Sequence, residues 1–389
     1  MNLNSIKFTR DKLERSEWNI AGKSDDGLNN NPLTLENINL IVGKNASGKS
    51  RTIDAIRHVA DLVSGEVELK QLNEIGLGTA DYYLNFSDGE IKIEYILEYK
   101  NGLIKEEKLL VEGKEKLNRG LGKLWYEELN DYLDFQTDEN VLAITKRDKK
   151  QHSFFENIYL WGKTLNHFKF GTQLGKDYLL RDINSLNDSD ELDFKDNRKV
   201  AEVFIKGKEK FPDFVNTLVA DMKKLSYELK DIDAKPLNNF PISAVGISVK
   251  ENDIEEITDQ RSMSQGMFRA LSLLIQLNYS LLNKLSSCIL IDDIGEGLDY
   301  DRSKKLIDLI IEKVKISKVQ VLMTTNDRFV MNKIPIEYWS VIQRVPKKAV
   351  FYNYKNSKLT FDDFKYTGLN NFDFLSTEFY VKGFDNQKN

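Results

Sequence analysis

The eight residues from Gly43 to Ser50 read Gly-Lys-Asn-Ala-Ser-Gly-Lys-Ser and fit the pattern G-x-x-x-x-G-K-[ST]. A loop of this kind turns successive backbone N–H groups toward phosphate oxygens, the lysine reaches the β and γ oxygens, and the serine hydroxyl can bind Mg²⁺. The sequence therefore predicts a site for a nucleotide with its magnesium ion. The candidate nucleotide-binding residues are Gly43, Lys44, Asn45, Ala46, Ser47, Gly48, Lys49, Ser50 and Arg51.

Two carboxylates end an apolar run later in the chain. The stretch Cys-Ile-Leu-Ile-Asp-Asp begins at Cys288 and ends at Asp293. An unbroken apolar run is typical of a strand buried on both faces of a parallel sheet, and the carboxyl ends of such strands form the ligand-binding edge. Because Mg²⁺ prefers oxygen ligands, we expect Asp292 to hold the magnesium ion together with Ser50.

A third stretch, Ser264-Gln265-Gly266, precedes an apolar run that predicts a helix from Ala270 to Leu285. Backbone N–H groups at the start of a helix attract anions. Serine at this place is also typical of an ordinary helix cap. Taken alone, the stretch leaves both interpretations open.

Hydrophobic spacing predicts the elements that must position these residues. Residues 40–42 predict a buried strand before the phosphate loop, and apolar residues at helical spacing after Ser50 predict a helix. Alternating runs over 82–112, with an Asn-Gly turn at Asn101, predict an antiparallel meander. Residues 319–327 predict another buried strand that ends in a polar turn.

The middle and the end of the chain carry weaker signals. Apolar residues at helical spacing behind Pro212 predict an amphipathic helix from Phe214 to Leu229. We therefore expect a mainly helical insertion over 150–239. The tail, residues 340–389, combines strand-like pieces with many aromatic residues, for which we favour core packing over a docking surface.

These motifs, in this order along the chain, resemble those of the ABC-type ATPase superfamily, and within it the soluble SMC-like, RecF-like and OLD branch. The resemblance implies that Asp293 is the catalytic acid, although this family usually has glutamate there. It places Asn326 where the family has a switch histidine, and asparagine cannot carry a proton. Glu296 is a further candidate base if its loop folds back.

The resemblance also implies a site completed by a second copy of the chain. Ser264, Gln265 and Gly266 match the signature motif, which is offered to the nucleotide of another protomer, and Asp299 matches the D-loop at the same seam. Gln151 is a candidate for the metal-binding glutamine that joins the two lobes, and an ordinary surface glutamine is the alternative.

The expected fold class is α/β: an ABC-type ATPase head with a mixed, largely parallel sheet, a flanking antiparallel β layer and a helical insertion. We expect a discontinuous head over 1–149 and 240–350. The insertion covers 150–239, and a C-terminal segment over 351–389 packs on the head or on a partner.

Composition narrows the class further. The net charge of −5 argues against a surface coated with basic groups for nucleic acid, although the basic stretch 146–150 is either a solvated loop or a local DNA contact. The single cysteine excludes a disulfide framework. No apolar run approaches the roughly eighteen residues of a membrane helix, and the N-terminus lacks a signal-peptide core. We therefore expect a cytoplasmic protein that does not enter a membrane.

The resulting hypothesis is an ATPase that uses ATP and Mg²⁺, dimerises head to head or forms a higher homo-oligomer, and switches a separate effector protein, in anti-phage defence. The alternative is a RecF-like ATPase of DNA repair or maintenance. A transporter ATPase fits less well, because the segment between the phosphate loop and the stretch at Ser264 is long and no membrane segment is present.

Overall fold

The computed structural model describes residues 1–11, 17–180, 196–237, 244–284 and 288–384. Within it the chain forms two compact units, one built from residues 1–165 and 334–389 and the other from residues 166–333. This division falls elsewhere than the domain boundaries expected from the sequence, which remain a prediction. Parts of the expected insertion, 181–195 and 238–239, lie outside the described residues.

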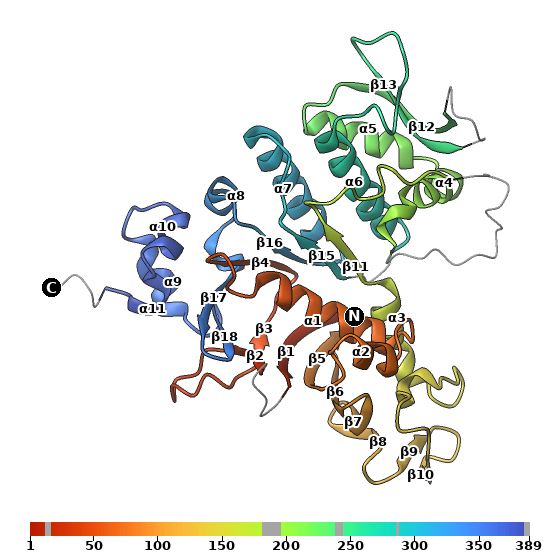
Figure 1. The fold of residues 1–389 in the computed structure, drawn as a ribbon, viewed down its shortest axis with the longest axis vertical. Coiled ribbons are helices and arrows are strands. Elements are labelled where there is room, and N and C mark those ends of the chain that lie inside the picture. Colours follow the sequence, from red (N-terminus) through yellow and green to blue (C-terminus); the bar gives the residue numbers. More distant parts are fainter. Residues whose placement is uncertain (12–16, 181–195, 238–243, 285–287, 385–389) are drawn as a thin grey trace. The chain divides into compact units, whose positions relative to one another are not determined.

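A long mixed sheet dominates the first unit (Figure 1). Its strands follow the spatial order β10-β9-β8-β7-β6-β5-β1-β2-β18-β17-β4, and β3 pairs with β1. The pairs β17–β4 and β18–β2 are parallel, and the others within this unit are antiparallel. The strands are β1 (Asn2–Arg10), β2 (Trp18–Gly22), β3 (Leu33–Thr34), β4 (Ile38–Gly43), β5 (Ala80–Asp88), β6 (Ile91–Lys100), β7 (Leu103–Val111), β8 (Lys114–Asn118), β9 (Lys123–Tyr126), β10 (Asp131–Asp134), β17 (Trp339–Val345) and β18 (Lys348–Asn353).

The expected strand, loop and helix around the phosphate loop are confirmed. All six residues of β4 are buried, as the apolar run predicts. The antiparallel meander is also present as β5, β6 and β7, and it continues through β8 to β10. The helices of this unit are α1 (Lys49–Val63), α2 (Leu69–Glu74), α3 (Glu156–Thr164), α9 (Lys358–Lys365), α10 (Asn371–Ser376) and α11 (Phe379–Lys382), with short 3-10 turns η1 (Ala143–Thr145), η2 (Ser153–Phe155) and η5 (Ile336–Tyr338).

The second unit contains the parallel strands β11, β15 and β16 and a small antiparallel sheet in the order β12-β13-β14. The strands are β11 (Asn166–Lys169), β12 (Leu229–Pro236), β13 (Val245–Glu251), β14 (Thr258–Asp259), β15 (Cys288–Asp292) and β16 (Gln320–Thr324). The helices are α4 (Val200–Lys210), α5 (Phe214–Lys224), α6 (Gln265–Leu282), α7 (Tyr300–Lys315) and α8 (Arg328–Lys333), with the 3-10 turn η4 (Asn197–Lys199).

Two helices differ from their predictions. Helix α6 begins at Gln265, before the expected start at Ala270, and its expected end at Leu285 lies outside the described residues. Helix α5 ends at Lys224, so the expected extension to Leu229 is wrong. The backbone of Ser226 is left-handed, with φ of 61°, which stops the helix. Leu229 instead begins β12, where it pairs with Glu251. Leu229 continues the apolar spacing of the helix only by chance, because it belongs to the strand that follows.

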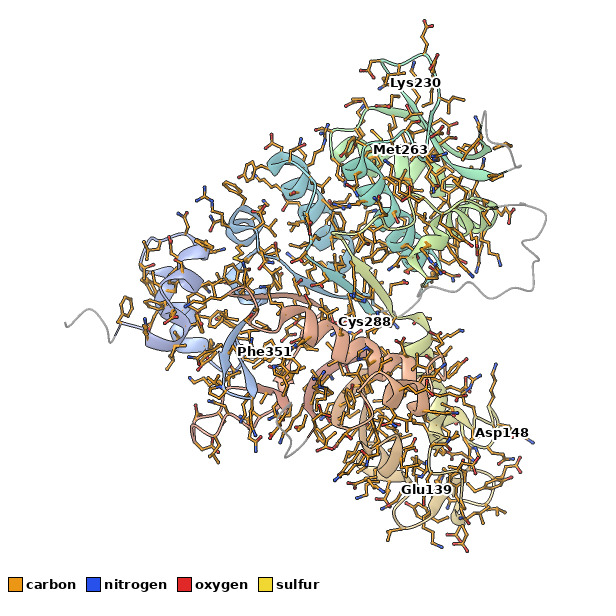
Figure 2. All side chains as sticks on the ribbon, in the orientation of Figure 1. Glu139, Asp148, Lys230, Met263, Cys288 and Phe351 are labelled. Atoms are coloured by element: carbon orange, nitrogen blue, oxygen red, sulfur yellow. The ribbon has the colours of Figure 1, made fainter. Side chains whose placement is uncertain are left out.

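Cys288 begins β15 deep inside the second unit (Figure 2). Its side chain is fully buried, and burial raises the pKa of its thiol to about 12. The residue therefore acts as a small apolar core side chain. Among the described residues, no helix is both long enough and apolar enough to cross a membrane.

Candidate functional site

The phosphate loop connects β4 to α1 in the first unit. Ala46 and Gly48 adopt left-handed backbone angles, with φ of 58° and 114°. A Cβ atom on Gly48 would lie 2.8 Å from Cζ2 of Trp18, and one on Gly43 would lie 2.6 Å from Oγ of Ser47. A side chain at Gly48 is therefore excluded both by its left-handed backbone and by Trp18, and a side chain at Gly43 would crowd Ser47. The loop keeps the compact form that phosphate binding needs.

Two polar side chains of the loop are buried and fit an anion. Lys49 is the first residue of helix α1. Its ammonium group donates to the carbonyl of Gly43 at 2.9 Å and to the carbonyl of Lys44 at 3.3 Å. The Ser47 hydroxyl is buried and has no hydrogen-bond partner. A buried hydroxyl without a partner costs free energy, and a phosphate oxygen in the loop would satisfy it. The residues present therefore fit a nucleotide phosphate.

Residues distant in sequence hold the outside of the loop. Arg344, from β17, donates to the carbonyl of Ala46 at 2.7 Å, and Glu378 forms an ion pair with Lys44. The guanidinium of Arg51 lies 5.8 Å from the ring centre of Trp18. The sequence did not point to Trp18, Arg344 or Glu378 as neighbours of the loop. Only Arg344 could have been found from the sequence, because it lies near the carboxyl end of a strand-like run, and the carboxyl ends of parallel strands meet at the edge of the sheet where the loop lies.

The acidic residues expected at the edge of the sheet are brought together in the second unit. Strands β15 and β16 are parallel neighbours, so Asp292 and Thr324 end side by side. The Thr324 hydroxyl donates to Oδ1 of Asp292 at 2.5 Å and accepts from the N–H of Asp293 at 2.9 Å. Asp292 is buried, with 8% of its surface exposed. Thr324 thus fixes the buried carboxylate in place.

Asp293 and Asn326, predicted as the catalytic acid and the histidine replacement, are in contact. The Asn326 amide donates to Oδ1 of Asp293 at 3.1 Å. Asp293 has a left-handed backbone, with φ of 55°. Aspartate tolerates this conformation better than most residues, and such geometry is concentrated at functional sites. The amide holds the carboxylate in one orientation, and the remaining acceptor capacity of a carboxylate suits a water molecule.

Glu296 lies on the turn that follows these acids. Its N–H donates to the carbonyl of Asp293 at 3.2 Å, and its own carbonyl accepts from Arg269 at 2.9 Å. A Cβ atom on Gly171 would lie 2.5 Å from Oε2 of Glu296, so the carboxylate is directed toward that backbone. Burial lowers the pKa of Arg269, whereas the nearby Glu296 carboxylate raises it. The carboxylate of Glu296 thus faces the backbone of Gly171, and its role as a base remains a prediction.

The signature residues and the D-loop residue both cap helices. Ser264 accepts from the N–H of Met267 at 3.2 Å at the start of α6, and Gln265 donates to Gln173 at 3.1 Å. Asp299 accepts from the N–H of Arg302 at 2.9 Å at the start of α7, and this bond is the main cause that lowers the pKa of Asp299.

The start of α6 packs directly against the D-loop. A Cβ atom on Gly266 would lie 2.8 Å from the carbonyl oxygen of Gly297 and 3.0 Å from Leu298. Only glycine allows this approach. The structure therefore brings together the signature stretch and the D-loop. The resemblance implies that both stretches face the same second protomer, and this remains a prediction.

Gln151 is not brought to the phosphate loop. Its N–H donates to Oδ1 of Asp148 at 3.0 Å, and its side chain hydrogen-bonds Glu128. Asp148 lies beyond α3, at the edge of the first unit that carries β8 to β10 (Figure 2). Helix α3 packs on the far end of α1, where a Cβ atom on Gly162 would lie 2.5 Å from the carbonyl of Ala60. The metal assignment of Gln151 thus has no support in this geometry.

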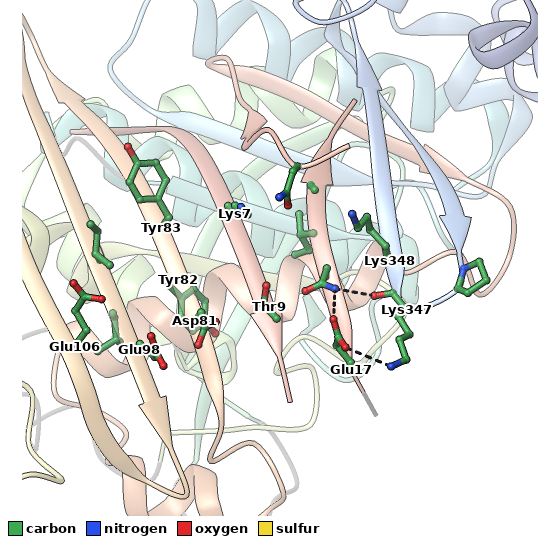
Figure 3. A pocket seen from close by; sticks show the side chains of 17 residues that line it. Lys7, Thr9, Glu17, Asp81, Tyr82, Tyr83, Glu98, Glu106, Lys347 and Lys348 are labelled. Carbon is green, nitrogen blue, oxygen red and sulfur yellow. Dashed lines mark hydrogen bonds and ion pairs between the residues drawn. The ribbon is translucent and has the colours of Figure 1, made fainter. Parts of the chain in front are cut away.

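A hollow of about 630 Å³ lies on the open face of the sheet in the first unit (Figure 3). Its lining mixes charges of both signs. Asp81, Glu98 and Glu106 lie on β5, β6 and β7, Lys7 lies on β1, and Glu17 lies beside Lys347, with which it forms an ion pair (Figure 3). The hollow contains none of the residues predicted to bind the nucleotide. Among the described residues, no group of three or more His, Cys, Asp or Glu is arranged to hold a metal ion.

Comparisons with known proteins agree with the geometry. A protein-family model described as "AAA domain, putative AbiEii toxin, Type IV TA system" matches residues 38–332, more than half of the chain. No curated protein matches the sequence significantly. A crystal structure of an SMC head bound to the C-terminal winged-helix domain of ScpA is similar to this chain, with a TM-score of 0.53 and 15% identity, and it covers 90% of this chain and 97% of that chain.

Two further structures match with lower scores. They are the SMC head domain from Thermotoga maritima, with a TM-score of 0.43, 14% identity and coverage of 90% and 98%, and a Pyrococcus furiosus SMC head with an extended coiled coil, bound to the C-terminal domain of ScpA, with a TM-score of 0.45, 15% identity and coverage of 93% and 99%. The likeness to the SMC head with a TM-score of 0.53 shows that the chain has the α/β fold of an SMC head. The chain belongs to the family described as "AAA domain, putative AbiEii toxin, Type IV TA system".

Proposed function

We propose that this protein binds ATP with Mg²⁺, hydrolyses it slowly, and uses nucleotide-dependent dimerisation to switch a separate effector protein in anti-phage defence. The observation that carries the proposal is the network in which Thr324 holds Asp292 and Asn326 holds Asp293. The oriented carboxylate of Asp293 can act as a general base that activates water. The buried carboxylate of Asp292 can hold the magnesium ion that binds the phosphate.

The assignment of roles follows the resemblance and the chemistry of each donor. The phosphate loop binds the phosphates through its backbone and Lys49, and Ser50 and Asp292 are the proposed magnesium ligands. When bound, Mg²⁺ supplies Lewis-acid neutralisation of the phosphate charge. A nucleotide site needs only one or two protein ligands for Mg²⁺, because phosphates and waters complete its coordination.

Slow turnover is supported by two side chains. Asp293 is shorter than the usual glutamate by one carbon–carbon bond, roughly 1.5 Å, and a misplacement of about 1 Å can cost on the order of 100-fold in rate. Asn326 can donate a hydrogen bond but cannot carry a proton. We therefore expect a turnover number well below the typical enzyme median of about 10 s⁻¹, which suits a timer more than a pump.

The effector role is supported by what the site lacks and by the family description. Among the described residues, no group of three or more His, Cys, Asp or Glu is arranged to hold a metal ion for a second reaction. The family description names a toxin of a type IV toxin–antitoxin system. A closure motion driven by ATP needs a partner that receives it.

Substitution of Lys49 tests the nucleotide site. Lys49→Ala removes the positive charge that faces the β and γ phosphates, so we expect ATP binding to weaken and hydrolysis to fall by at least 100-fold. Calorimetry and a phosphate-release assay with purified protein measure both effects. Lys70→Ala, an exposed lysine on α2, is the matched control.

The outcomes separate the alternatives. Unchanged hydrolysis in Lys49→Ala would contradict the assignment of the loop. Strong stimulation of hydrolysis by DNA in the wild-type protein would favour the RecF-like alternative, and stable complex formation with the product of a neighbouring gene would favour the effector switch.

A further inference from the structure

The C-terminal helices are fixed to the first unit by an aromatic core. Phe374 of α10 packs on Trp339 of β17 with ring centres 6.4 Å apart, and Tyr380 of α11 packs on Tyr352 of β18 at 5.3 Å. Phe361 of α9 packs on Phe374 at 4.6 Å. All five rings are buried. The segment that joins α10 to α11 therefore has a defined position relative to the sheet.

That segment presents one carboxylate to the phosphate loop. Glu378 precedes α11 with a left-handed backbone, φ of 59°, which is unusual for a glutamate. One carboxylate oxygen pairs with Lys44 of the loop, and the other lies 3.1 Å from the ammonium of Lys382. Both ammonium groups, that of Lys44 first, hold the pKa of Glu378 below its ordinary value. Strained backbone at a contact between distant segments often accompanies function.

The partner lysine is itself linked to the phosphate-binding lysine. The carbonyl of Lys44 accepts a hydrogen bond from the Lys49 ammonium, while the Lys44 side chain is two-thirds exposed beside Glu378. Arg344, on β17, binds the carbonyl of Ala46 two residues further along the loop. Glu378 and Arg344 both lie outside the range that the family model matches.

We propose that Glu378 is a positioning residue of the nucleotide site, which acts through Lys44 and couples the C-terminal helices to phosphate binding. The proposal rests on the proposed function, because it requires that the loop binds a nucleotide. While Glu378 neutralises Lys44, that cation is unavailable to an anionic ligand. Phosphates that attract Lys44 weaken the ion pair and thereby loosen the segment at α10 and α11.

Thermodynamic reciprocity gives the coupling two measurable signs. If ATP weakens the contact between Lys44 and Glu378, loss of that contact must strengthen ATP binding by the same factor. Exposed ion pairs are worth about 0.2–1 kcal/mol, so the expected change in the dissociation constant is about 1.4- to fivefold at low ionic strength.

A double-mutant cycle tests the proposal. The dissociation constants of ATP and ADP are measured by calorimetry for the wild type, Glu378→Gln, Lys44→Ala and the double variant. We expect Glu378→Gln to bind ATP about 1.4- to fivefold more tightly, and we expect the gain to disappear when Lys44 is already alanine. The matched control is Glu337→Gln, which breaks the 2.7 Å ion pair with Lys365 in the same C-terminal region and should leave affinity unchanged.

Hydrogen exchange supplies a readout that does not depend on affinity. Amides of residues 371–384 should exchange faster when ATP binds the wild type, and Glu378→Gln should exchange fast with or without ATP. An affinity unchanged by Glu378→Gln, or an equal gain in the Lys44→Ala background, would overturn the proposal. If the wild type binds no nucleotide at all, the proposed function fails instead, so the two failures are distinguishable.

Discussion

At the scale of single residues, the pair formed by Asp293 and Asn326 determines how the proposed ATP hydrolysis is expected to work. The family that the sequence resembles has a histidine at the position of Asn326. An amide has no proton to exchange near neutral pH, so orientation is what Asn326 can contribute. The 3.1 Å bond to Oδ1 of Asp293 supplies that orientation.

Substitutions of this pair should separate orientation from base chemistry. Asp293→Asn removes the base, and we expect turnover to fall by about 100-fold or more. Asn326→Ala removes only the orienting donor, and we expect a smaller loss of about tenfold. ATP affinity should change little in either variant. Steady-state phosphate release together with calorimetry checks both numbers, and full activity in Asp293→Asn would refute the base assignment.

The sequence predicted those residues that are fixed by spacing along the chain. The phosphate loop and Asp292 follow from a pattern and an apolar run, and the role of Asp293 follows from the resemblance. Thr324 and Glu378 were not predicted, because their roles depend on contacts between residues that are distant in the sequence. Thr324 meets Asp292 through the pairing of β16 with β15, and Glu378 is 334 positions from Lys44. No local pattern encodes such a separation.

At the scale of elements, the close approach of α6 to the D-loop has a measurable cost if it is disturbed. In Gly266→Ala the added methyl group would lie 2.8 Å from the carbonyl oxygen of Gly297, and backbone on both sides limits relaxation. We expect a loss of about 1–3 kcal/mol in the free energy of unfolding. Urea denaturation measures it.

A second glycine provides the control for this prediction. At Gly120 the nearest atom to an added Cβ lies 3.5 Å away, so Gly120→Ala should change stability by less than about 0.5 kcal/mol. Equal stability of both variants would show that the start of α6 can shift without penalty.

Elements were predictable where their period is regular. Strands β4 to β7 and helices α1 and α6 follow clear apolar patterns. Helix α5 was expected to be too long, because Leu229 of the next strand continued its spacing. The three short C-terminal helices were not predicted, since helices of four to eight residues carry little periodic signal. Their aromatic residues were expected to pack in a core. Phe361, Phe364, Phe374, Phe379 and Tyr380 are buried, whereas Phe372 is half-buried.

At the scale of the whole molecule, the assigned motifs divide between the two compact units. The phosphate loop belongs to the first, and Ser264, Gly266 and Asp299 belong to the second. The resemblance implies that signature residues serve the nucleotide of another copy. A helix cap, the role observed for Ser264, does not by itself decide between that role and a purely structural one.

Mixing of two inactive variants decides it. Ser264→Arg blocks the signature surface, and Lys49→Ala disables the phosphate loop. If sites are shared between copies, a mixture should form heterodimers with about one working site, and ATP hydrolysis should recover. Ser264→Ala, which loses only the cap at a cost of about 1 kcal/mol, controls for stability. Absence of recovery, with both variants folded, would place the whole site in one chain.

The buried thiol of Cys288 has a practical consequence. It is the only cysteine of the chain, it is fully buried, and its pKa of about 12 leaves it protonated at neutral pH. Because thiolates are the reactive species, the natural sequence already behaves as a background without accessible thiols. A cysteine introduced at Leu359, which is 80% exposed on α9, would accept a fluorophore at one known position. Movements of the C-terminal helices during nucleotide turnover could then be followed optically without further engineering.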